Sequence, residues 1–432
     1  MTMNHPNLAT NFADQCSPYN RRQFLKTAAA AGLSITAVTS GLQAAAPQEL
    51  PPTRTITRGP KYHWFGYYDK LEFDPSGRYV LGMEVDFEHR SPRADDEIKI
   101  GMVDLQDNDR WIELGSSTAW GWQQGCMLQW RPGSDREIVW NDRDDGRYVC
   151  RIMDVFSRKQ RTIDQAIYAL SPDGRSAVGL DFARVNDVRP GYGYVGIPDS
   201  NADELAPSDS GIYRVDLETG ESQTIIPIAE ALKTVDKKEW NPECKHYFNH
   251  LLVNPDGTRF IMLHRWQYPD GHRRTRMLTA NTDGKDLRIV DDNGLTSHFI
   301  WRDPNTILAY SEQQPHGRGF FLFQDETGGE AEFIGKGILK RDGHCSYLPG
   351  DEWILNDTYP DSNRNQMPHL FHIATGKVVP LGYFRSAPEY KGEWRCDTHP
   401  RFSPDGTKVV VDTPHGGHGR QLHLIDIGGI VS

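Results

Sequence analysis

A short turn motif recurs along the chain and constrains its fold more than any other feature. In four copies an apolar strand end leads into a Pro, a polar residue and a Gly: Phe73–Gly77, Leu170–Gly174, Val253–Gly257 and Phe402–Gly406. Proline presets the backbone of such a turn, and glycine accepts the positive φ that other residues resist. Internal self-similarity of this kind is typical of repeat architectures.

Three weaker copies bring the number of units to seven. They are Leu128–Gly133, Phe299–Pro304 and Tyr347–Asp351, and the steps between successive turns are mostly 41 to 56 residues. An apolar segment follows nearly every turn, as at Tyr79–Met83 and Val409–Val411. This spacing predicts an all-β chain that forms a seven-bladed β-propeller over residues 47–432.

Ring closure and one insertion complete the expected architecture. The N-terminal segment Arg54–Thr57 is expected to supply the outer strand of the last blade and so to close the ring. The step from Gly174 to Gly257 is 83 residues long. It contains Pro190–Tyr194 and the polar stretch Asp199–Ser210, so an inserted loop is expected there.

The first 46 residues are interpreted as a twin-arginine signal peptide. Arg21 and Arg22 are followed by Phe24-Leu25-Lys26, a weakly apolar run and small residues at 44–46. Such a leader passes folded proteins out of the cytoplasm. The run is too short and too rich in Ala, Thr, Ser and Gly to span a membrane well. We therefore expect a periplasmic or secreted protein without stable membrane insertion once the leader is removed.

The charge balance bears on the class of partner. The formal net charge is −11, and the leader has three basic residues against one acidic residue, which leaves −13 for the remainder. Such an acidic body argues against a general nucleic-acid or anionic-membrane surface, although one local cationic pocket remains compatible with it. The five cysteines beyond the leader form no metal knuckle and are expected to be buried as small apolar residues.

Histidines recur at one position of the last four expected blades. His250, His298 and His399 lie seven residues before the turn glycine or its equivalent, and His344 lies six residues before it. That turn joins the inner strand of a blade to the second strand, so these positions lie at the other end of the inner strand, facing the channel. The spacing predicts four imidazoles at nearly one height. The alternative is structural, because Gly343-His344 resembles the Gly-His that only ties the blade together in WD-type propellers.

Other polar and aromatic side chains are expected at the same channel mouth. His63 and Tyr67 come from the first blade, and Arg143, Arg265 and Asp357 come from loops that follow second strands. Arg143 and Arg265 fit the role of solvated loop charges equally well, and Tyr67 fits a packing role better than a catalytic one.

Imidazole, guanidinium and phenol groups together suit elimination on a uronate sugar. Removing the C5 proton and expelling the group at C4 needs a base, a neutralised carboxylate and an acid for the departing oxygen. The paired carboxylates of glycoside hydrolysis are less evident in the sequence, although Asp357 could belong to such a pair.

The turn copies, together with His298, His344 and the run Cys396–Gly406, resemble oligogalacturonate lyase. The opening run His63–Asp69 resembles propeller lyases that act on ulvan or rhamnosyl-glucuronate ends. The resemblance implies a uronate lyase with a histidine base and a carboxylate-binding arginine. It also implies a divalent ion, manganese or calcium, at His344 and His399, because histidines and a glutamine hold such an ion in the oligogalacturonate enzymes.

Our leading hypothesis is an exported lyase that acts on an acidic oligo- or polysaccharide. In it His250 or His298 is the base, Tyr67 or His63 assists the leaving group, and three residues contact the substrate: Arg143, Arg265 and Asp357. One alternative is a propeller glycoside hydrolase that releases a terminal sugar such as rhamnose. The other is a non-catalytic, TolB-like envelope propeller that binds protein partners.

Overall fold

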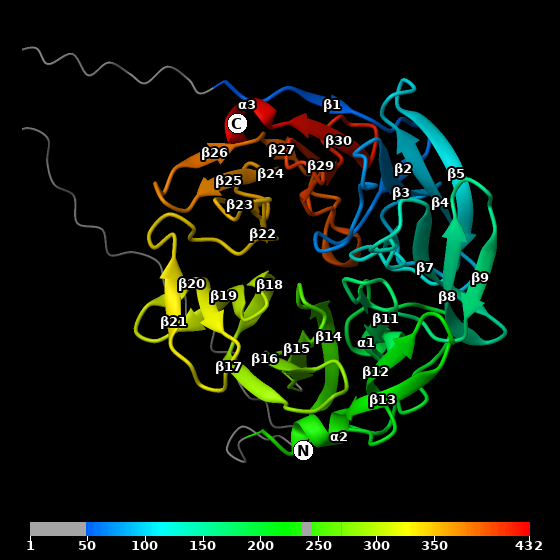
Figure 1. The fold of residues 1–432 in the computed structure, drawn as a ribbon, viewed down its shortest axis with the longest axis vertical. Coiled ribbons are helices and arrows are strands. Elements are labelled where there is room, and N and C mark those ends of the chain that lie inside the picture. Colours follow the sequence, from blue (N-terminus) through cyan, green and yellow to red (C-terminus); the bar gives the residue numbers. More distant parts are fainter. Residues whose placement is uncertain (1–48, 236–242, 269) are drawn as a thin grey trace, which may run out of the picture. The chain divides into compact units, whose positions relative to one another are not determined.

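The computed structural model describes residues 49–235, 243–268 and 270–432, and the leader expected over residues 1–46 lies outside the described residues. Seven four-stranded sheets surround a central axis (Figure 1). The predicted seven-bladed β-propeller is confirmed.

In the first five blades the strands pair in sequence order, from the centre outward. Blade 1 contains β2 (Tyr62–Trp64), β3 (Tyr79–Val85), β4 (Ile98–Asp104) and β5 (Arg110–Ser117). Blade 2 contains β6 (Gln129–Trp130), β7 (Glu137–Asp144), β8 (Arg147–Asp154) and β9 (Gln160–Ile163). Blade 3 contains β10 (Ala169–Leu170), β11 (Ser176–Gly179), β12 (Gly211–Asp216) and β13 (Ser222–Pro227). Blade 4 contains β14 (Lys245–Val253), β15 (Arg259–Gln267), β16 (Arg273–Asn281) and β17 (Arg288–Gly294). Blade 5 contains β18 (Thr296–Asp303), β19 (Thr306–Gln313), β20 (Gly317–Gln324) and β21 (Ala331–Ile334).

The last two blades differ slightly from this plan. Blade 6 contains β22 (Ser346–Tyr347), β23 (Trp353–Asn356), β25 (His369–His372) and β26 (Val378–Pro380), and a separate pair is formed by β24 (Asn365–Gln366) and β27 (Phe384–Arg385). Blade 7 contains β28 (Arg401–Phe402), β29 (Lys408–Thr413), β30 (Gln421–Asp426) and β1 (Thr53–Thr55). The short helices are α1 (Phe182–Val188), α2 (Ile228–Leu232), α3 (Gly428–Val431) and the 3₁₀ turn η1 (Gly392–Trp394).

The N-terminal strand closes the ring, as the sequence predicts. Strand β1 pairs antiparallel with β30, with Thr53 opposite Ile425 and Thr55 opposite His423. The outer edge of the last blade is therefore made by the beginning of the described chain (Figure 1).

The expected insertion lies between β11 and β12 and is anchored by a buried arginine. Arg184 of α1 donates to the carbonyl oxygen of His246 (2.8 Å), to the Asp199 carboxylate (3.1 Å) and to the carbonyl oxygen of Leu205 (2.9 Å). These bonds satisfy the buried guanidinium group and fix the insertion against blade 4.

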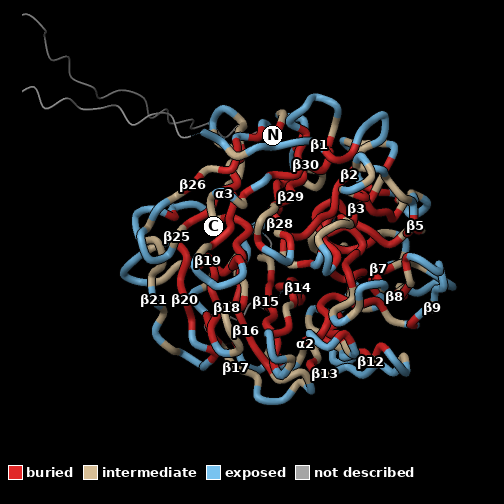
Figure 2. The backbone as a smooth tube through the Cα atoms, turned by 45° about the horizontal axis from the view of Figure 1, so that its top comes forward, coloured by how far each residue is buried: buried red, intermediate tan, exposed pale blue. Residues whose placement is uncertain are grey.

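The core lies between the blades. Because each sheet packs against a neighbour on both faces, the middle of the second strands is buried, as at 80–83 in β3 and 138–141 in β7 (Figure 2). In β15 every residue except Gln267 is buried. The five described cysteines are free and buried, as expected. Among the described residues, no helix combines the length and the apolar character that crossing a membrane requires.

A buried ionic network joins blade 7 to blade 1. The Arg401 guanidinium group donates to both carboxylate oxygens of Glu72 (2.9 and 3.0 Å) and to the Asp412 carboxylate (2.7 Å). Burial raises the pKa of Glu72 to about 7 even though Arg401 opposes that rise. One cation therefore compensates two carboxylates that have little access to water.

We expect Arg401→Met to destabilise the protein by about 3–5 kcal/mol, because it leaves two buried carboxylates without their cation. The pKa values of these carboxylates would rise further, so the loss grows as the pH rises from 5 to 8 and the groups are forced to ionise. Thermal unfolding followed by circular dichroism at the two pH values measures the effect. Arg136→Met is the control, because Arg136 pairs with Asp154 at the surface. Equal unfolding midpoints for the two variants would contradict the prediction.

Candidate active site

The inner strand of blade 1 is interrupted by a loop that runs towards the axis. Strand β2 ends at Trp64, and pairing with β3 resumes only at Phe73, which bridges Val80. Gly66 in this loop has φ +106°, and a Cβ atom there would lie 2.9 Å from the backbone of Gln124. Only glycine fits this close approach. We call residues 65–72 the axial loop.

The axial loop crosses from blade 1 to the opposite side of the ring. The Tyr68 hydroxyl donates to the carbonyl oxygen of Phe299 in blade 5 (2.7 Å) and accepts from the amide of the same residue (3.0 Å). At its base the loop is held by the Asp412 carboxylate, which accepts from the amides of Phe65 (3.3 Å) and Gly66 (3.1 Å). This arrangement places Tyr67 between the inner strands.

The structure brings the four predicted histidines together around Tyr67. From the centre of the Tyr67 ring, the imidazole centres lie at 4.8 Å (His250), 5.3 Å (His399), 6.1 Å (His344) and 6.5 Å (His298). His344 lies 4.2 Å from both His298 and His399, centre to centre. All five side chains are buried. The common register in the sequence therefore corresponds to one compact cluster, which we call the axial cluster.

Two of these histidines have an unusual backbone. His250 has φ +52° and sits at a bulge in β14, where its neighbours Asn249 and Leu251 pair with the consecutive residues Leu263 and Met262. His399, just before β28, has φ +38°. A bulge turns one side chain out of the regular alternation, and backbone strain of this kind concentrates at functional sites.

The hydrogen bonds of His250 define its protonation state. Nδ1 faces the Gln124 amide nitrogen (2.9 Å) and the Tyr168 hydroxyl (3.1 Å), and Nε2 faces the Tyr67 hydroxyl (3.3 Å). The Gln124 amide can only donate, so Nδ1 accepts and the Nε2 proton points to the Tyr67 oxygen. Burial, and then Arg189, hold the pKa of His250 well below its usual value. The ring is therefore neutral.

His298 and His344 each rest against a carboxylate. His298 Nδ1 lies 2.8 Å from Asp342, and His344 Nδ1 lies 2.9 Å from Asp357. Burial lowers the pKa of His298 although Asp342 opposes the effect. For His344, burial also lowers the pKa, but Asp357 outweighs it and the pKa is raised. In both residues the carboxylate fixes the ring and leaves Nε2 towards the cluster.

Two arginines and a tyrosine complete the cluster. The Arg189 guanidinium group lies 3.9 Å from the centre of the Tyr192 ring, and Arg395 donates to the Tyr192 hydroxyl (2.6 Å). The Tyr192 ring meets His250 edge to face at 5.7 Å. Burial acts to raise the pKa of Tyr192, but the two arginines outweigh it and the pKa is lowered. This corner of the cluster favours negative charge.

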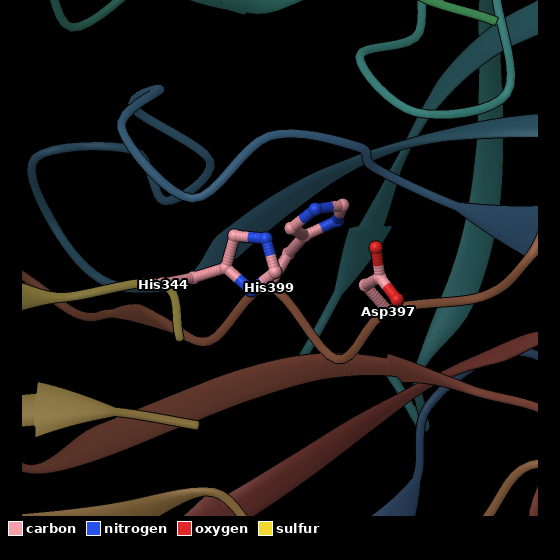
Figure 3. A group of neighbouring side chains, drawn as sticks. All are labelled: His344, Asp397 and His399. Atoms are coloured by element: carbon pink, nitrogen blue, oxygen red, sulfur yellow. The ribbon is translucent and has the colours of Figure 1, made fainter. Parts of the chain in front are cut away.

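A metal-compatible group lies next to these residues. One ligand atom each from His344, Asp397 and His399 lies within 4.8 Å of the others (Figure 3). The His344 Nε2 atom is buried and has no hydrogen-bond partner among the described residues. Burial, and then His344, lower the pKa of His399 well below its usual value, so that imidazole is neutral as well. Two imidazole nitrogens and a carboxylate fit a divalent transition ion.

Three predicted site residues lie elsewhere. Arg143 and Arg265 belong to the strands β7 and β15, where they pair with Tyr148 and Thr275, and not to the loops beyond them. Arg143 donates to the carbonyl oxygen of Ala94, and buried Arg265 faces that of Thr296 at 3.5 Å. Side chains of second strands point between blades, which removes both arginines from the axis.

His63 also points away from the axis. Its Nδ1 lies 3.0 Å from Gln421 and its Nε2 lies 3.2 Å from Glu84, with its ring against Trp111 at 4.9 Å between centres. These contacts tie blade 1 to blade 7. Strand alternation explains the placement, since His63 lies inside β2.

Asp357 is at the cluster but faces protein groups. Its carboxylate accepts from the backbone amide of His344 (2.8 Å) and the Thr398 hydroxyl (2.5 Å) as well as binding the imidazole, and its pKa is lowered to about 2. Burial opposes this shift, and His344 outweighs it. The structure thus gives Asp357 a positioning contact in place of the predicted substrate contact. The alternative that His344 only ties its blade together explains the contact of Nδ1 with Asp357. It does not explain Nε2, which has no hydrogen-bond partner among the described residues.

Sequence reasoning missed Arg189, Tyr192, Arg395 and Asp342 as site residues. Arg189 and Tyr192 follow α1 in the insertion, which has no repeat register to locate it. The one sequence signal that could have pointed to them is local: the Gly- and Tyr-containing run Pro190–Tyr194 directly follows Arg189.

Solved structures of known proteins have the same fold as this chain. An oligogalacturonate lyase in complex with manganese superposes with a TM-score of 0.62 and 17% identity, over 87% of this chain and 93% of that one. An oligogalacturonate lyase from Vibrio parahaemolyticus gives a TM-score of 0.60 and 15% identity, with the same coverage of both chains. The chain shares the fold of oligogalacturonate lyase. At this identity the likeness shows the fold alone. No protein-family model and no curated sequence matches the chain.

We expect the Tyr192 phenol to ionise below the usual tyrosine pKa of about 10, because Arg189 and Arg395 stabilise its anion. Subtracting the alkaline absorbance titration of Tyr192→Phe from that of the wild type isolates this one phenol. In an Arg189→Met background the midpoint should move up. A difference titration at or above the usual value in the wild type would contradict the assignment.

Proposed function

We propose that the axial cluster catalyses β-elimination in a uronate-containing oligo- or polysaccharide. The observation that carries the proposal is a buried, unpaired guanidinium N–H beside neutral imidazoles. Among the described residues, Nη1 of Arg189 has no hydrogen-bond partner. A carboxylate is the ligand that best satisfies such a donor.

His298 is the proposed base. Asp342 holds its Nδ1, and the lowered pKa keeps the ring neutral, so Nε2 has a lone pair to accept the C5 proton. His250 is less suited, because Gln124 and Tyr168 occupy Nδ1 and the proton on Nε2 points to Tyr67.

Tyr67 is the proposed acid. Its oxygen accepts from His250 Nε2, so the hydroxyl proton remains free to pass to the oxygen that leaves C4. Burial raises the pKa of Tyr67 well above its usual value, which keeps the phenol protonated before reaction. The C5–H and C4–O bonds break, a C4–C5 double bond forms, and proton exchange with water restores His298 and Tyr67.

A divalent ion would be held by His344, Asp397 and His399. When bound it would neutralise the sugar carboxylate together with Arg189 and so acidify the C5 proton. Two imidazole donors favour manganese over calcium, which prefers oxygen ligands. The neighbour that binds manganese supports this choice. Export by the twin-arginine leader is part of the proposal, since polymeric glycans lie outside the cytoplasm.

A panel of uronate-containing glycans tests the reaction. Elimination creates an unsaturated uronate that absorbs in the ultraviolet, whereas hydrolysis releases reducing sugar without this absorbance. We expect absorbance to rise with at least one glycan, and His298→Ala to lower kcat by about 10²–10⁴-fold because the base is lost. Tyr67→Phe should also lower kcat.

His418→Ala is the control for this panel. His418 is an exposed loop histidine, and its removal should leave kcat unchanged. The proposal fails if no glycan gives unsaturated product, or if both His298→Ala and Tyr67→Phe retain full activity. A product that has new reducing ends but no ultraviolet absorbance would favour the alternative of a glycoside hydrolase.

Manganese binding tests the metal group separately from turnover. After chelator treatment, calorimetry with Mn²⁺ should show one site per chain. His399→Ala should weaken binding at least tenfold, because one of three ligands is lost. His418→Ala again serves as the control. Equal Mn²⁺ affinity in the wild type and His399→Ala would remove the ion from this position.

A further inference from the structure

A cavity lies at blade 6, next to loops that hold the axial cluster. Its volume is about 300 Å³, at the lower end of the range for small-molecule sites. Its lining includes Ile338, Lys340, Arg341, Thr358, Asn365 and Tyr383.

Two loops connect this cavity to the axial cluster. Arg341 lines the cavity and directly precedes Asp342, which holds His298. Thr358 lines the cavity and directly precedes Tyr359, whose ring lies 5.8 Å from His344, centre to centre. Neighbouring Cα atoms are 3.8 Å apart, so on both loops a residue that lines the cavity adjoins one that contacts the axial cluster.

The charged groups of the cavity favour an anion. In the part of the chain that the structure describes, neither Lys340 nor Arg341 has a side-chain hydrogen bond or ion pair, and both are exposed. The cavity also contains one carboxylate, Asp361. Its Oδ1 accepts hydrogen bonds from the backbone amides of Asn363 (2.8 Å) and Asn365 (2.9 Å), within its own turn. Two unpaired cations therefore dominate the cavity.

An exposed apolar rim accompanies these cations. Tyr383 is 52% exposed and Ile338 is 47% exposed, and both line the cavity. Large apolar side chains that gather at a cavity mouth mark binding surfaces. An aromatic face with adjacent polar groups suits the apolar face and hydroxyl groups of a pyranose ring.

We propose that this cavity is a second uronate subsite, which binds the carboxylate of the sugar next to the one that reacts. The proposal rests on the proposed lyase function and deepens it. It makes the substrate a run of at least two uronates. Lys340 and Arg341 would hold the second carboxylate, and Tyr383 would pack against its ring.

Matched oligouronates test the subsite. One substrate set carries free carboxylates throughout, and the other has methyl esters on every residue except the one that reacts. We expect the wild type to have a KM at least tenfold lower for the free acids. Lys340→Ala/Arg341→Ala should lose this preference and keep kcat within twofold. Tyr383→Ala should raise KM for both sets.

The control is a second Arg-Lys neighbour pair. Arg158 and Lys159 are exposed in the turn between β8 and β9, which lies on the opposite face from the channel mouth. Arg158→Ala/Lys159→Ala should keep the wild-type preference. If the lyase is active but Lys340→Ala/Arg341→Ala retains the preference, the subsite is overturned and the proposed function stands.

Binding without turnover separates the two proposals. Calorimetry of a free-acid oligouronate with His298→Ala should give at least tenfold tighter binding than with His298→Ala/Lys340→Ala/Arg341→Ala. If no glycan is cleaved but this difference is found, the reaction is wrong and the binding subsite is supported. Equal affinities would overturn the subsite.

Discussion

The pairing of one buried guanidinium group with two carboxylates underlies the rest of the structure. Arg401 holds Glu72 at the end of the axial loop and Asp412 at its base, and both carboxylates are buried. The attachment fixes the loop at both ends, and the contact from Tyr68 to blade 5 fixes its middle. Without it, Tyr67 would have no defined place among the histidines, and the cluster would lose its centre.

Burial gives this cluster its chemistry. Desolvation disfavours charge on buried imidazoles, so His250, His298 and His399 all have lowered pKa values, His298 in spite of its contact with Asp342. The same effect keeps Tyr67 protonated. Only where a counter-charge is in contact does the balance reverse, as at His344 with Asp357 and at Tyr192 with its two arginines. Neutral bases, a phenol and a cationic corner thus coexist within one small volume.

The fold could be predicted from the sequence because its signals are local and repeated. Each Pro-x-Gly turn marks where an inner strand ends, and this rule located the blades and the height of His250, His298, His344 and His399. The rule says nothing about side chains on second strands unless the strand length is known. Strands β7 and β15 run to Asp144 and Gln267, beyond the point assumed from the sequence, so Arg143 and Arg265 stay within the sheets.

The cationic residues of the site could not be found in the same way. Arg189 lies in the insertion and Arg395 in the long segment before β28, and neither has a counterpart in the other blades. Their position depends on tertiary contacts with Tyr192, which come from separate parts of the chain. Repeats predict what the blades share, as at the four histidines, whereas these cationic residues lie in segments that the blades do not share.

The pairing of β1 with β30 has a consequence for how the molecule forms. The final sheet needs strands from both termini, so the circle of blades cannot be completed while the C-terminal residues are still being synthesised. Until then the axial loop from blade 1 lacks its partner Arg401 in blade 7. The closing edge and the anchor of the axial loop therefore both depend on blade 7 being in place beside blade 1.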